Sequence, residues 1–238
     1  MYAGDRIALL GPNGSGKSTL VKQMIGLLRP QSGQVLLADQ NAAKLSVAEA
    51  ARKVGYVFQN PGHMLFAPTV REELAFGPRN IGQRDDEIAR NSAVALELLG
   101  LAGFEDRPPL TLSFGQQRRL CIASVVAMRA GVLLMDEPTA GQDYRSYTQF
   151  MDGIIQLGAF AAQIFITHDL DLAISYANRI WLFVDGTIVA DGPPTEVLSD
   201  EALLRRCRIL PTSLWHENRR LLPHSGGMQR LEELAALV

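Results

Sequence analysis

Short apolar runs alternate along the chain with longer stretches in which apolar residues recur at helical spacing. Several of the runs have polar residues only at their edges, which is typical of strands covered on both faces. We expect strands at Arg6–Leu10, Gln34–Ala38, Val54–Phe58, Val132–Asp136, Gln163–Thr167 and Ile180–Val184. We expect helices at about Gly16–Leu28, Asp85–Leu101, Phe114–Arg129, Gln142–Leu157 and Leu170–Ala177. This alternation predicts an α/β fold with a mainly parallel sheet.

The stretch of residues 60–130 differs, because almost all of it has the helical pattern. Thr69-Val-Arg-Glu72 matches a capping box, in which the first and last side chains bond each other's backbone N–H groups at a helix start. We therefore expect a helical subdomain inserted at about 60–130. The dipeptide Asp185-Gly186 between apolar residues is a hairpin signal, so we expect the sheet to end in an antiparallel pair.

The end of the chain predicts a small appendage to one main domain at 1–206. Prolines and glycines interrupt residues 207–238, and four apolar residues recur there at helical spacing. These residues are Met228, Leu231, Leu234 and Val238. We expect a C-terminal extension that caps the domain rather than a dedicated partner site.

Composition narrows the class of protein. A chain of 238 residues with 47% hydrophobic residues excludes intrinsic disorder and collagen-like repeats. A net charge of -2 gives no basic field that would indicate nucleic acid. Two cysteines are too few for a disulfide framework, and we interpret Cys121 as a small buried hydrophobe. The start lacks a signal-peptide pattern and no apolar stretch is long enough to span a bilayer, so we expect a soluble, cytoplasmic protein.

A phosphate-binding loop follows the first predicted strand. Gly11-Pro-Asn-Gly-Ser-Gly-Lys-Ser18 fits the pattern G-x-x-x-x-G-K-[ST] between a strand and a helix. Backbone N–H groups of such a loop point at phosphate oxygens, and the following helix presents its positive end to the same anion. Lys17 would reach the β- and γ-phosphates, and the Ser18 hydroxyl would hold Mg²⁺. The expected ATP-binding residues are Gly11, Pro12, Asn13, Gly14, Ser15, Gly16, Lys17, Ser18 and Thr19.

Polar side chains end three of the other predicted strands. Asp136 and Glu137 end a buried run, at the position where open α/β sheets bind ligands. Asp136 can enter the Mg²⁺ shell, and Glu137 can accept a proton from an attacking water. Gln59 and His168 each follow a strand in the same way. Because these strands would end at one edge of the sheet, we interpret all four side chains as site residues.

Leu112-Ser-Phe-Gly-Gln116 begins a helix with a serine cap, and here a family resemblance becomes specific. The chain resembles ATP-binding-cassette (ABC) ATPase subunits over nearly its whole length. Six features stand in the order of that family: the phosphate-binding loop, Gln59, the signature at 112–116, Asp136-Glu137, the Ala140-Gly-Gln-Asp143 turn and His168. The resemblance implies a P-loop NTPase fold of the ABC ATPase type, with a helical subdomain inserted in the parallel-sheet core.

The resemblance also implies a shared mechanism. Two such domains close head to tail over two ATP molecules, so that Ser113, Gly115 and Gln116 bind the nucleotide held by the opposite subunit. Glu137 polarises the attacking water and His168 holds the γ-phosphate. Gln59 senses Mg²⁺ and γ-phosphate for a partner docked on the helical subdomain, and Asp143 lies in the turn that couples the two sites.

A narrower resemblance lies in the segment Phe58–Pro78, which begins Phe58-Gln-Asn-Pro-Gly-His-Met-Leu-Phe-Ala-Pro-Thr-Val70. It is similar to the energy-coupling-factor group of importers, which take up vitamins, vitamin precursors or transition-metal ions. There the segment rests on a transmembrane coupling protein, beside a substrate-binding membrane protein, which implies a peripheral place on the cytoplasmic face of the membrane. The alternative is that the segment is only the core of the helical subdomain.

Two motifs depart from the family pattern. The signature has Phe114 where a glycine is usual, and the turn before Asp143 lacks the leucine that commonly precedes the aspartate. Both changes resemble the second ATPase half of fused tandem proteins, which implies a non-identical partner domain. A nucleotide-sensing subunit that hydrolyses poorly is therefore the alternative to a motor subunit. An ABC protein that acts on DNA or the ribosome ranks last, because no coiled-coil insertion or basic field supports it.

The third departure is at the start, where only ten residues precede Gly11. Family members carry an antiparallel sheet there, with an aromatic that stacks on adenine, and we expect this sheet to be missing or truncated. A fragment of a tandem protein, a start assigned too late, or a base held differently would each account for it. We predict weak ATP binding by the isolated chain. A sub-micromolar dissociation constant for the purified monomer in a calorimetric titration would contradict this.

Overall fold

The computed structural model describes residues 1–225 and 227–236, which form two compact units. The first unit contains Met1–Leu20, Glu137–Gln142 and the chain from Ala162 onward. The second contains Val21–Asp136 and Asp143–Ala161. One of the four places at which the chain passes from one unit to the other falls between the adjacent carboxylates Asp136 and Glu137.

The first unit is built on four strands in the order β6-β1-β7-β8. β1 (Arg6–Leu10) is parallel to β6 (Ala162–Thr167) and to β7 (Arg179–Val184), whereas β8 (Thr187–Gly192) is antiparallel to β7. Leu10 lies opposite Thr167, so the segments that follow β1 and β6 emerge at the same edge. The alternation of apolar runs predicted these parallel strands correctly.

The β7–β8 hairpin confirms the signal at Asp185-Gly186. These two residues have φ angles of +47° and +77°, which are the left-handed values that a two-residue hairpin turn requires. Glycine adopts such a value without cost, and aspartate is one of the few other residues that tolerates it. The local sequence therefore determines the antiparallel end of this sheet.

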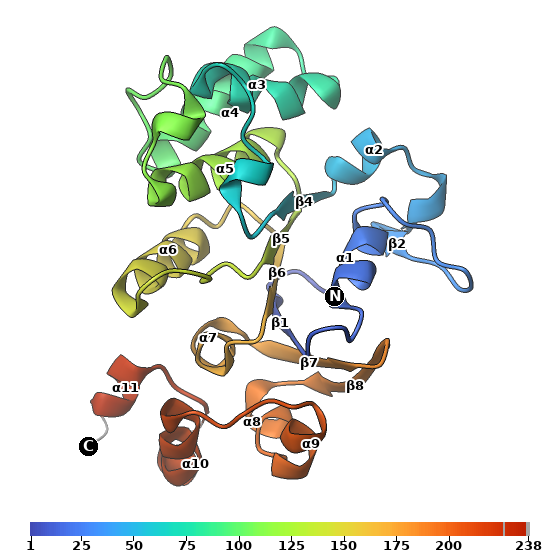
Figure 1. Ribbon diagram of the computed structural model, residues 1–238. Helices are drawn as coiled ribbons and strands as arrows, with labels where there is room; N and C mark the ends of the chain where they lie inside the picture. The colour runs from blue at the N-terminus through green and yellow to red at the C-terminus, as the bar shows by residue number, and fades with distance from the viewer. Residues whose placement is uncertain (226, 237–238) are drawn as a thin grey trace. The chain divides into compact units, whose positions relative to one another are not determined.

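Short helices complete the first unit: α7 (Leu170–Tyr176), α8 (Pro194–Val197), α9 (Glu201–Arg206), α10 (Ser213–Ser225) and α11 (Leu231–Ala235). α10 contacts both α7 and α11 (Figure 1). The predicted apolar face of a terminal helix is partly wrong. Arg230 caps α11, so Met228 precedes the helix; Leu231 is exposed and Leu234 is buried. Val238 lies outside the described residues.

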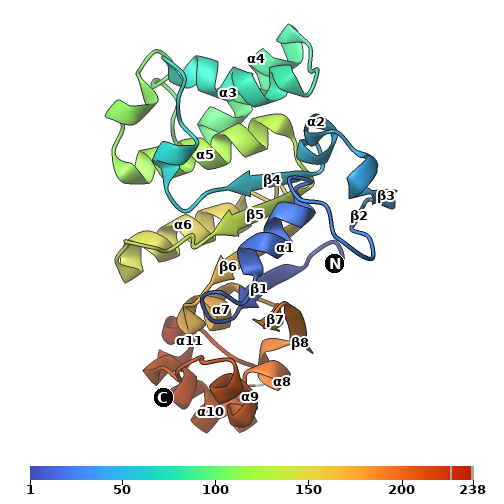
Figure 2. The same cartoon turned by 45° about the vertical axis from the view of Figure 1, so that its right-hand side comes forward.

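The second unit pairs β4 (Val54–Val57) with β5 (Val132–Asp136) in parallel. Three helices, α3 (Val70–Asn80), α4 (Asp85–Leu98) and α5 (Phe114–Met128), contact one another in both ribbon views (Figures 1 and 2). Thr69 caps α3 by accepting a hydrogen bond from the Glu72 N–H. The unit also holds α2 (Val47–Ala51) and α6 (Tyr144–Gln156).

Two predicted elements are wrong in extent. Within the predicted strand Gln34–Ala38, only β2 (Leu36–Leu37) forms, and it pairs antiparallel with β3 (Gln40–Asn41). Ala38 and Asp39 turn the chain back at once, with φ angles of +47° and +62°. The predicted helix Gly16–Leu28 is shorter, since α1 (Lys17–Met24) ends before Gly26, which has a φ of +75°. A glycine at this position is a common helix stop.

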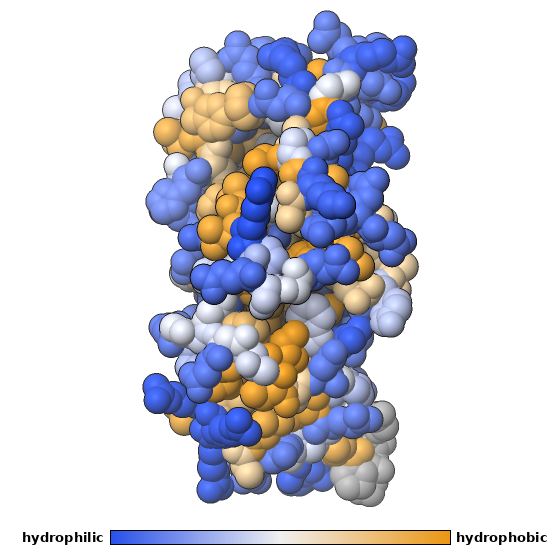
Figure 3. Space-filling view, turned by 90° about the vertical axis from the view of Figure 1, so that its right-hand side faces the viewer, coloured by the Kyte–Doolittle hydropathy of each residue, from blue (hydrophilic) through white to orange (hydrophobic). Residues whose placement is uncertain are grey.

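Cys121 is buried in α5, as predicted, and burial raises the pKa of its thiol to about 12. Figure 3 shows apolar patches set among hydrophilic side chains on the face that it displays. Within the described residues, no helix combines the length and the apolar character that crossing a membrane requires.

Helix α5 approaches β4 closely enough to require a glycine. A Cβ on Gly55 would lie 2.0 Å from Cγ1 of Val125. We predict that Gly55→Ala lowers the free energy of unfolding by about 1–3 kcal/mol through overpacking. The measurement is urea unfolding of the purified chain.

Gly153 provides the matched control, because it lies inside α6 and no neighbouring atom comes within 4 Å of the place that a Cβ would take there. Gly153→Ala should leave stability unchanged or raise it. Adding Val125→Ala to Gly55→Ala should recover part of the loss. Equal stability of the two alanine variants would contradict the close approach.

Candidate active site

The loop after β1 is shaped by glycines. A Cβ on Gly11 would lie 2.0 Å from the carbonyl oxygen of Phe183 in β7, so no larger residue fits there. Gly14 and Gly16 have φ angles of +81° and +101°. The Ser15 carbonyl accepts a hydrogen bond of 2.8 Å from the Gly186 N–H, which ties the loop to the β7–β8 turn. The loop is thus a tight cradle of backbone groups.

Lys17 and the start of α1 supply the positive charge of this cradle. The buried Lys17 ammonium donates hydrogen bonds to the carbonyls of Gly11 (2.7 Å) and Pro12 (3.0 Å). α1 begins at Lys17, and the Ser18 and Thr19 side chains in its first turn are exposed. Backbone N–H groups at a helix start have no intrahelical acceptor, so they are available to an anion.

Glu137 and His168 form a polar pair in the same unit. The Nδ1 atom of His168 lies 2.8 Å from Oε1 of Glu137, and the Thr167 hydroxyl donates to the other carboxylate oxygen over 3.3 Å. Glu137 is mostly buried, whereas the His168 side chain is 75% exposed. Because an ionised carboxylate only accepts hydrogen bonds, Nδ1 carries the proton in this pair and Nε2 is the nitrogen left for another partner.

The backbone of Glu137 is held in an uncommon conformation. Its φ angle is +45°, a left-handed value that costs free energy in any residue other than glycine. Its N–H donates a 2.9 Å hydrogen bond to the Ile166 carbonyl in β6, and its carbonyl accepts one from Ala140. Thr167 in turn accepts a bond from the Asp169 N–H at the start of α7. The surrounding backbone therefore determines where this carboxylate lies.

In the second unit, Asp136 ends β5 and Gln59 follows β4, the neighbouring parallel strand. Val57 lies opposite Met135, so both residues emerge at the carboxyl end of the β4–β5 pair. Asp136 Oδ2 accepts a 2.8 Å hydrogen bond from the Tyr56 hydroxyl. The Gln59 side chain is exposed, and its backbone carbonyl accepts a long hydrogen bond from Arg118 Nη2 (3.4 Å).

The signature residues lie at the start of α5. Ser113 and Gln116 form a complete capping box, in which each side chain accepts a hydrogen bond from the other residue's N–H. Ser113 and Gly115 are exposed, and so is Phe114, which lies over the guanidinium of Arg118 at 5.1 Å. The start of α5 therefore presents its backbone and small polar groups to solvent.

Asp143 caps α6. Its carboxylate accepts hydrogen bonds from the Ser146 N–H (2.9 Å) and hydroxyl (2.8 Å), and these bonds lower the pKa of Asp143. An aspartate at this position satisfies a helix N–H and complements the positive end of the helix. The hydrogen bonds between Asp143 and Ser146 therefore hold the exposed turn before α6.

Taken unit by unit, the structure brings some of the predicted residues together. The first unit holds Gly11–Thr19, Glu137 and His168; the second holds Gln59, Ser113, Asp136 and Asp143. Asp136 and Glu137 are consecutive, so the chain itself keeps one residue of each set adjacent. Sequence reasoning missed Tyr56 and Thr167, which bond these two carboxylates, although each is a polar-tipped residue within or at the end of a predicted strand.

The donor set suits a hydrated magnesium ion bound through phosphates. Within the described part of the chain, no three His, Cys, Asp or Glu side chains group as a metal site. Mg²⁺ characteristically uses one or two carboxylate or hydroxyl oxygens and completes its shell with water and substrate phosphates. Asp136 in the second unit and Ser18 in the first each carry an oxygen ligand of this kind, so the chemistry of each side chain fits that ion.

Comparison with known families decides the class of protein. The family described as ABC transporter matches residues 1–140 of the chain. This chain belongs to the ABC transporter family of ATP-binding subunits. It has the ABC ATPase fold, and the sequence-based prediction of that fold and of an ATPase is confirmed.

Curated relatives of this ABC ATPase include an ATP-binding protein of an energy-coupling factor transporter. The energy-coupling factor transporter ATP-binding protein EcfA of Methanocaldococcus jannaschii is 42% identical over 209 residues, which cover 87% of this chain and 75% of that protein. A putative ABC transporter ATP-binding protein of Streptomyces coelicolor is 44% identical over 206 residues, covering 87% of this chain and 78% of its own length.

Solved structures agree with this assignment. CbiO1 from Clostridium perfringens, part of the ABC transporter complex CbiONQ, aligns with a TM-score of 0.75 and 32% identity, covering 90% of this ABC ATPase and 87% of that chain. A dimeric ATP-binding cassette in a post-hydrolysis state with ADP and Pi aligns with a TM-score of 0.68 and 25% identity, covering 80% and 86%.

The Thr167 hydroxyl links the Glu137 carboxylate to the start of α7. Thr167→Val keeps the shape of the buried side chain but removes its hydroxyl. We predict that kcat for ATP hydrolysis falls about tenfold with KM for ATP nearly unchanged, because a hydrogen bond to a charged group is lost. Thr167→Ser retains the hydroxyl and should keep most of the activity. An equal loss in both variants would show that packing, not the hydroxyl, matters.

Proposed function

We propose that the chain binds and hydrolyses ATP to power substrate import through a membrane transporter of the energy-coupling-factor type. The cargo class would be a vitamin, a vitamin precursor or a transition-metal ion. The observation that carries the hydrolytic part is the Glu137–His168 pair, whose side chains lie 2.8 Å apart within the unit that holds the phosphate-binding loop. The likeness to EcfA and CbiO1 supports the importer part.

ATP binding would use the loop from Gly11 to Thr19. Its backbone N–H groups and the start of α1 would receive the phosphates. Lys17 would exchange its present acceptors, the carbonyls of Gly11 and Pro12, for β- and γ-phosphate oxygens. Nucleotide binding would therefore replace contacts within the loop by contacts to the substrate.

Hydrolysis would be assisted by two side chains that already contact each other. The Glu137 carboxylate would accept a proton from the attacking water, and its contacts with Thr167 and His168 would hold it in place. In its imidazolium form, in which both ring nitrogens carry protons, the exposed His168 ring would donate from Nε2 to the γ-phosphate. Gln59, whose side chain is exposed, would contact the same phosphate.

Mg²⁺ would neutralise charge on the phosphates as it develops. In this proposal Ser18, Asp136 and Gln59 hold the ion with water and phosphate oxygens. Asp136 is prepared for that role by the Tyr56 hydroxyl, which already bonds one of its oxygens.

A second ATPase domain would complete each nucleotide site. Ser113, Gly115 and Gln116 begin α5 with exposed or half-buried groups, and they would bind the nucleotide of the opposite domain in a head-to-tail dimer. Asp143 would stiffen the turn that faces the same partner. The dimeric cassette among the similar structures supports such a pair.

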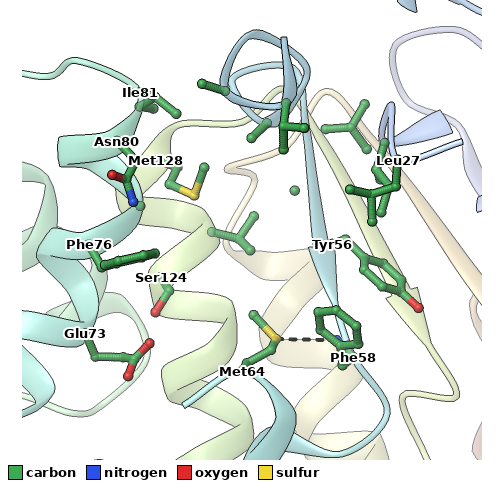
Figure 4. Close-up of a pocket in the computed structure, with 18 of the residues that line it drawn as sticks. Leu27, Tyr56, Phe58, Met64, Glu73, Phe76, Asn80, Ile81, Ser124 and Met128 are labelled. Atoms are coloured by element: carbon green, nitrogen blue, oxygen red, sulfur yellow. Dashed lines mark hydrogen bonds between the residues drawn. The ribbon is translucent and has the colours of Figure 1, made fainter. Parts of the chain in front are cut away.

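The membrane partner would dock on an apolar groove in the second unit. This cavity of about 590 Å³ is lined by Leu27, Val47, Phe58, Met64, Phe66 and Phe76, among others (Figure 4). Phe66 is 62% exposed and packs edge-on against Phe76. The buried Glu73 carboxylate accepts hydrogen bonds from the N–H groups of Phe66 and Ala67, which fixes that rim. An amphipathic helix of a coupling protein at the cytoplasmic face fits such a groove.

One observation favours a second candidate function. Phe114 is 48% exposed within the signature, where its ring would meet the partner's nucleotide. Its bulk favours a subunit that senses nucleotide but hydrolyses it poorly, in an asymmetric pair. ATP turnover by the Glu137→Gln variant distinguishes the motor subunit from the nucleotide-sensing subunit.

Glu137→Gln tests the motor function. In the complex purified with its membrane subunits, we predict that phosphate release from ATP falls at least about 100-fold, because the amide cannot accept the proton. ATP binding, measured by filter retention, should persist. Unchanged turnover would mean that this chain's site does not hydrolyse ATP, as the nucleotide-sensing alternative requires.

Phe66→Glu tests the groove. A charge in the apolar rim should reduce recovery of the membrane subunits with the tagged chain at least about tenfold, because the carboxylate loses its water when the partner covers it. Leu210→Glu is the matched control, since Leu210 is 82% exposed in the first unit. Equal recovery of the membrane subunits with both variants would argue against docking at this groove.

A further inference from the structure

The register of β4 and β5 places Tyr56 and Asp136 on the same face. Tyr56 lies opposite Leu134, and Asp136 follows two residues later along β5. Side chains two residues apart on a strand point to the same side of the sheet, so Asp136 is a diagonal neighbour of Tyr56. The phenol is long enough to reach across that diagonal, and its hydroxyl donates to Asp136 Oδ2 over 2.8 Å.

The hydroxyl donates and Asp136 accepts in this contact. The Tyr56 ring is half-buried. Among the described residues, Oδ2 has this partner, and no hydrogen bond to Oδ1 of Asp136 is found.

The ring that carries the hydroxyl is itself fixed. It packs against Phe58 with centroids 4.7 Å apart and lines the apolar groove on the side opposite its hydroxyl. In Figure 4 the Tyr56 hydroxyl points away from Met64 and Phe76, while Phe58 lies beside Met64. A fixed ring holds the hydroxyl at one place, whereas a water molecule in its stead could move.

We propose that Tyr56 is a positioning residue for the magnesium ligand Asp136, a role that rests on the proposed ATPase function. By occupying Oδ2, the phenol selects one orientation of the carboxylate and leaves Oδ1 for the ion. A free aspartate carboxylate rotates broadly about its last torsion, so an unsupported Asp136 would spend less time in the binding orientation. Side chains that orient a metal ligand in this way commonly contribute tenfold or more to metal affinity.

The test measures metal binding and nucleotide binding separately in the full chain. Mn²⁺ stands in for Mg²⁺ and is titrated in the presence of saturating non-hydrolysable ATP analogue, with free Mn²⁺ followed by electron paramagnetic resonance. Affinity for a fluorescent ATP is measured in EDTA. We expect Tyr56→Phe to weaken Mn²⁺ binding about tenfold and to leave the metal-free nucleotide affinity within about twofold of wild type.

Two further variants separate positioning from packing. Tyr147→Phe removes one oxygen from another buried tyrosine of the same unit and should leave Mn²⁺ affinity unchanged. In an Asp136→Asn background the carboxylate is absent. Tyr56→Phe should then weaken Mn²⁺ binding by less than about a further twofold, because Tyr56 acts on the metal only through that carboxylate.

The results of these titrations test two claims separately: the positioning role of Tyr56 and the proposed ATPase function. Equal Mn²⁺ affinity of wild type and Tyr56→Phe would overturn the positioning role while leaving the ATPase function intact. Parallel losses of Mn²⁺ and of metal-free nucleotide binding would also overturn it, since they indicate a general disturbance of the fold. Failure of the wild-type chain to bind Mn²⁺ with the nucleotide analogue would instead contradict the proposed function, and this inference with it.

Discussion

The carboxylate of Glu137 is the group on which the proposed chemistry depends, and the fold holds it through both its backbone and its side chain. Its backbone is kept at a left-handed φ of +45° by hydrogen bonds to β6 and to the following turn, and its side chain contacts Thr167 and His168. Strain of this kind persists only where the surrounding structure over-determines it. Since Asp136 precedes it directly, the same short segment carries both the proposed magnesium ligand and the group that would activate water.

The second unit combines two surfaces of different chemistry on β4. The ring of Tyr56 lines the apolar groove, and its hydroxyl donates a hydrogen bond to Asp136. Buried Arg118 donates to the Gln59 carbonyl while lying against Phe114 of the signature, and burial lowers its pKa. A partner bound in the groove would therefore contact β4. Gln59, which follows β4, is the proposed ligand of the metal and the γ-phosphate.

The sequence was sufficient for elements with a strong local cause. The parallel strands follow from continuous apolar runs, and the β7–β8 turn follows from Asp185-Gly186. It was insufficient where a turn intervened inside an apolar run, as at Ala38–Asp39, or where Gly26 ended α1 early. The Tyr56–Asp136 bond joins residues 80 positions apart through strand register, which no local pattern of one sequence reveals. The groove likewise exists only when α2, α3, α5 and β4 assemble.

The most direct test of the motor function is to follow transport and phosphate release together. The chain would be purified with its native membrane subunits and reconstituted in proteoliposomes, with the cargo identified by what co-purifies. Substrate uptake should require hydrolysable ATP and Mg²⁺, and should stop when a non-hydrolysable analogue replaces ATP. Equal uptake with the analogue, or uptake without phosphate release, would contradict the claim that this chain is an ATP-hydrolysing motor subunit.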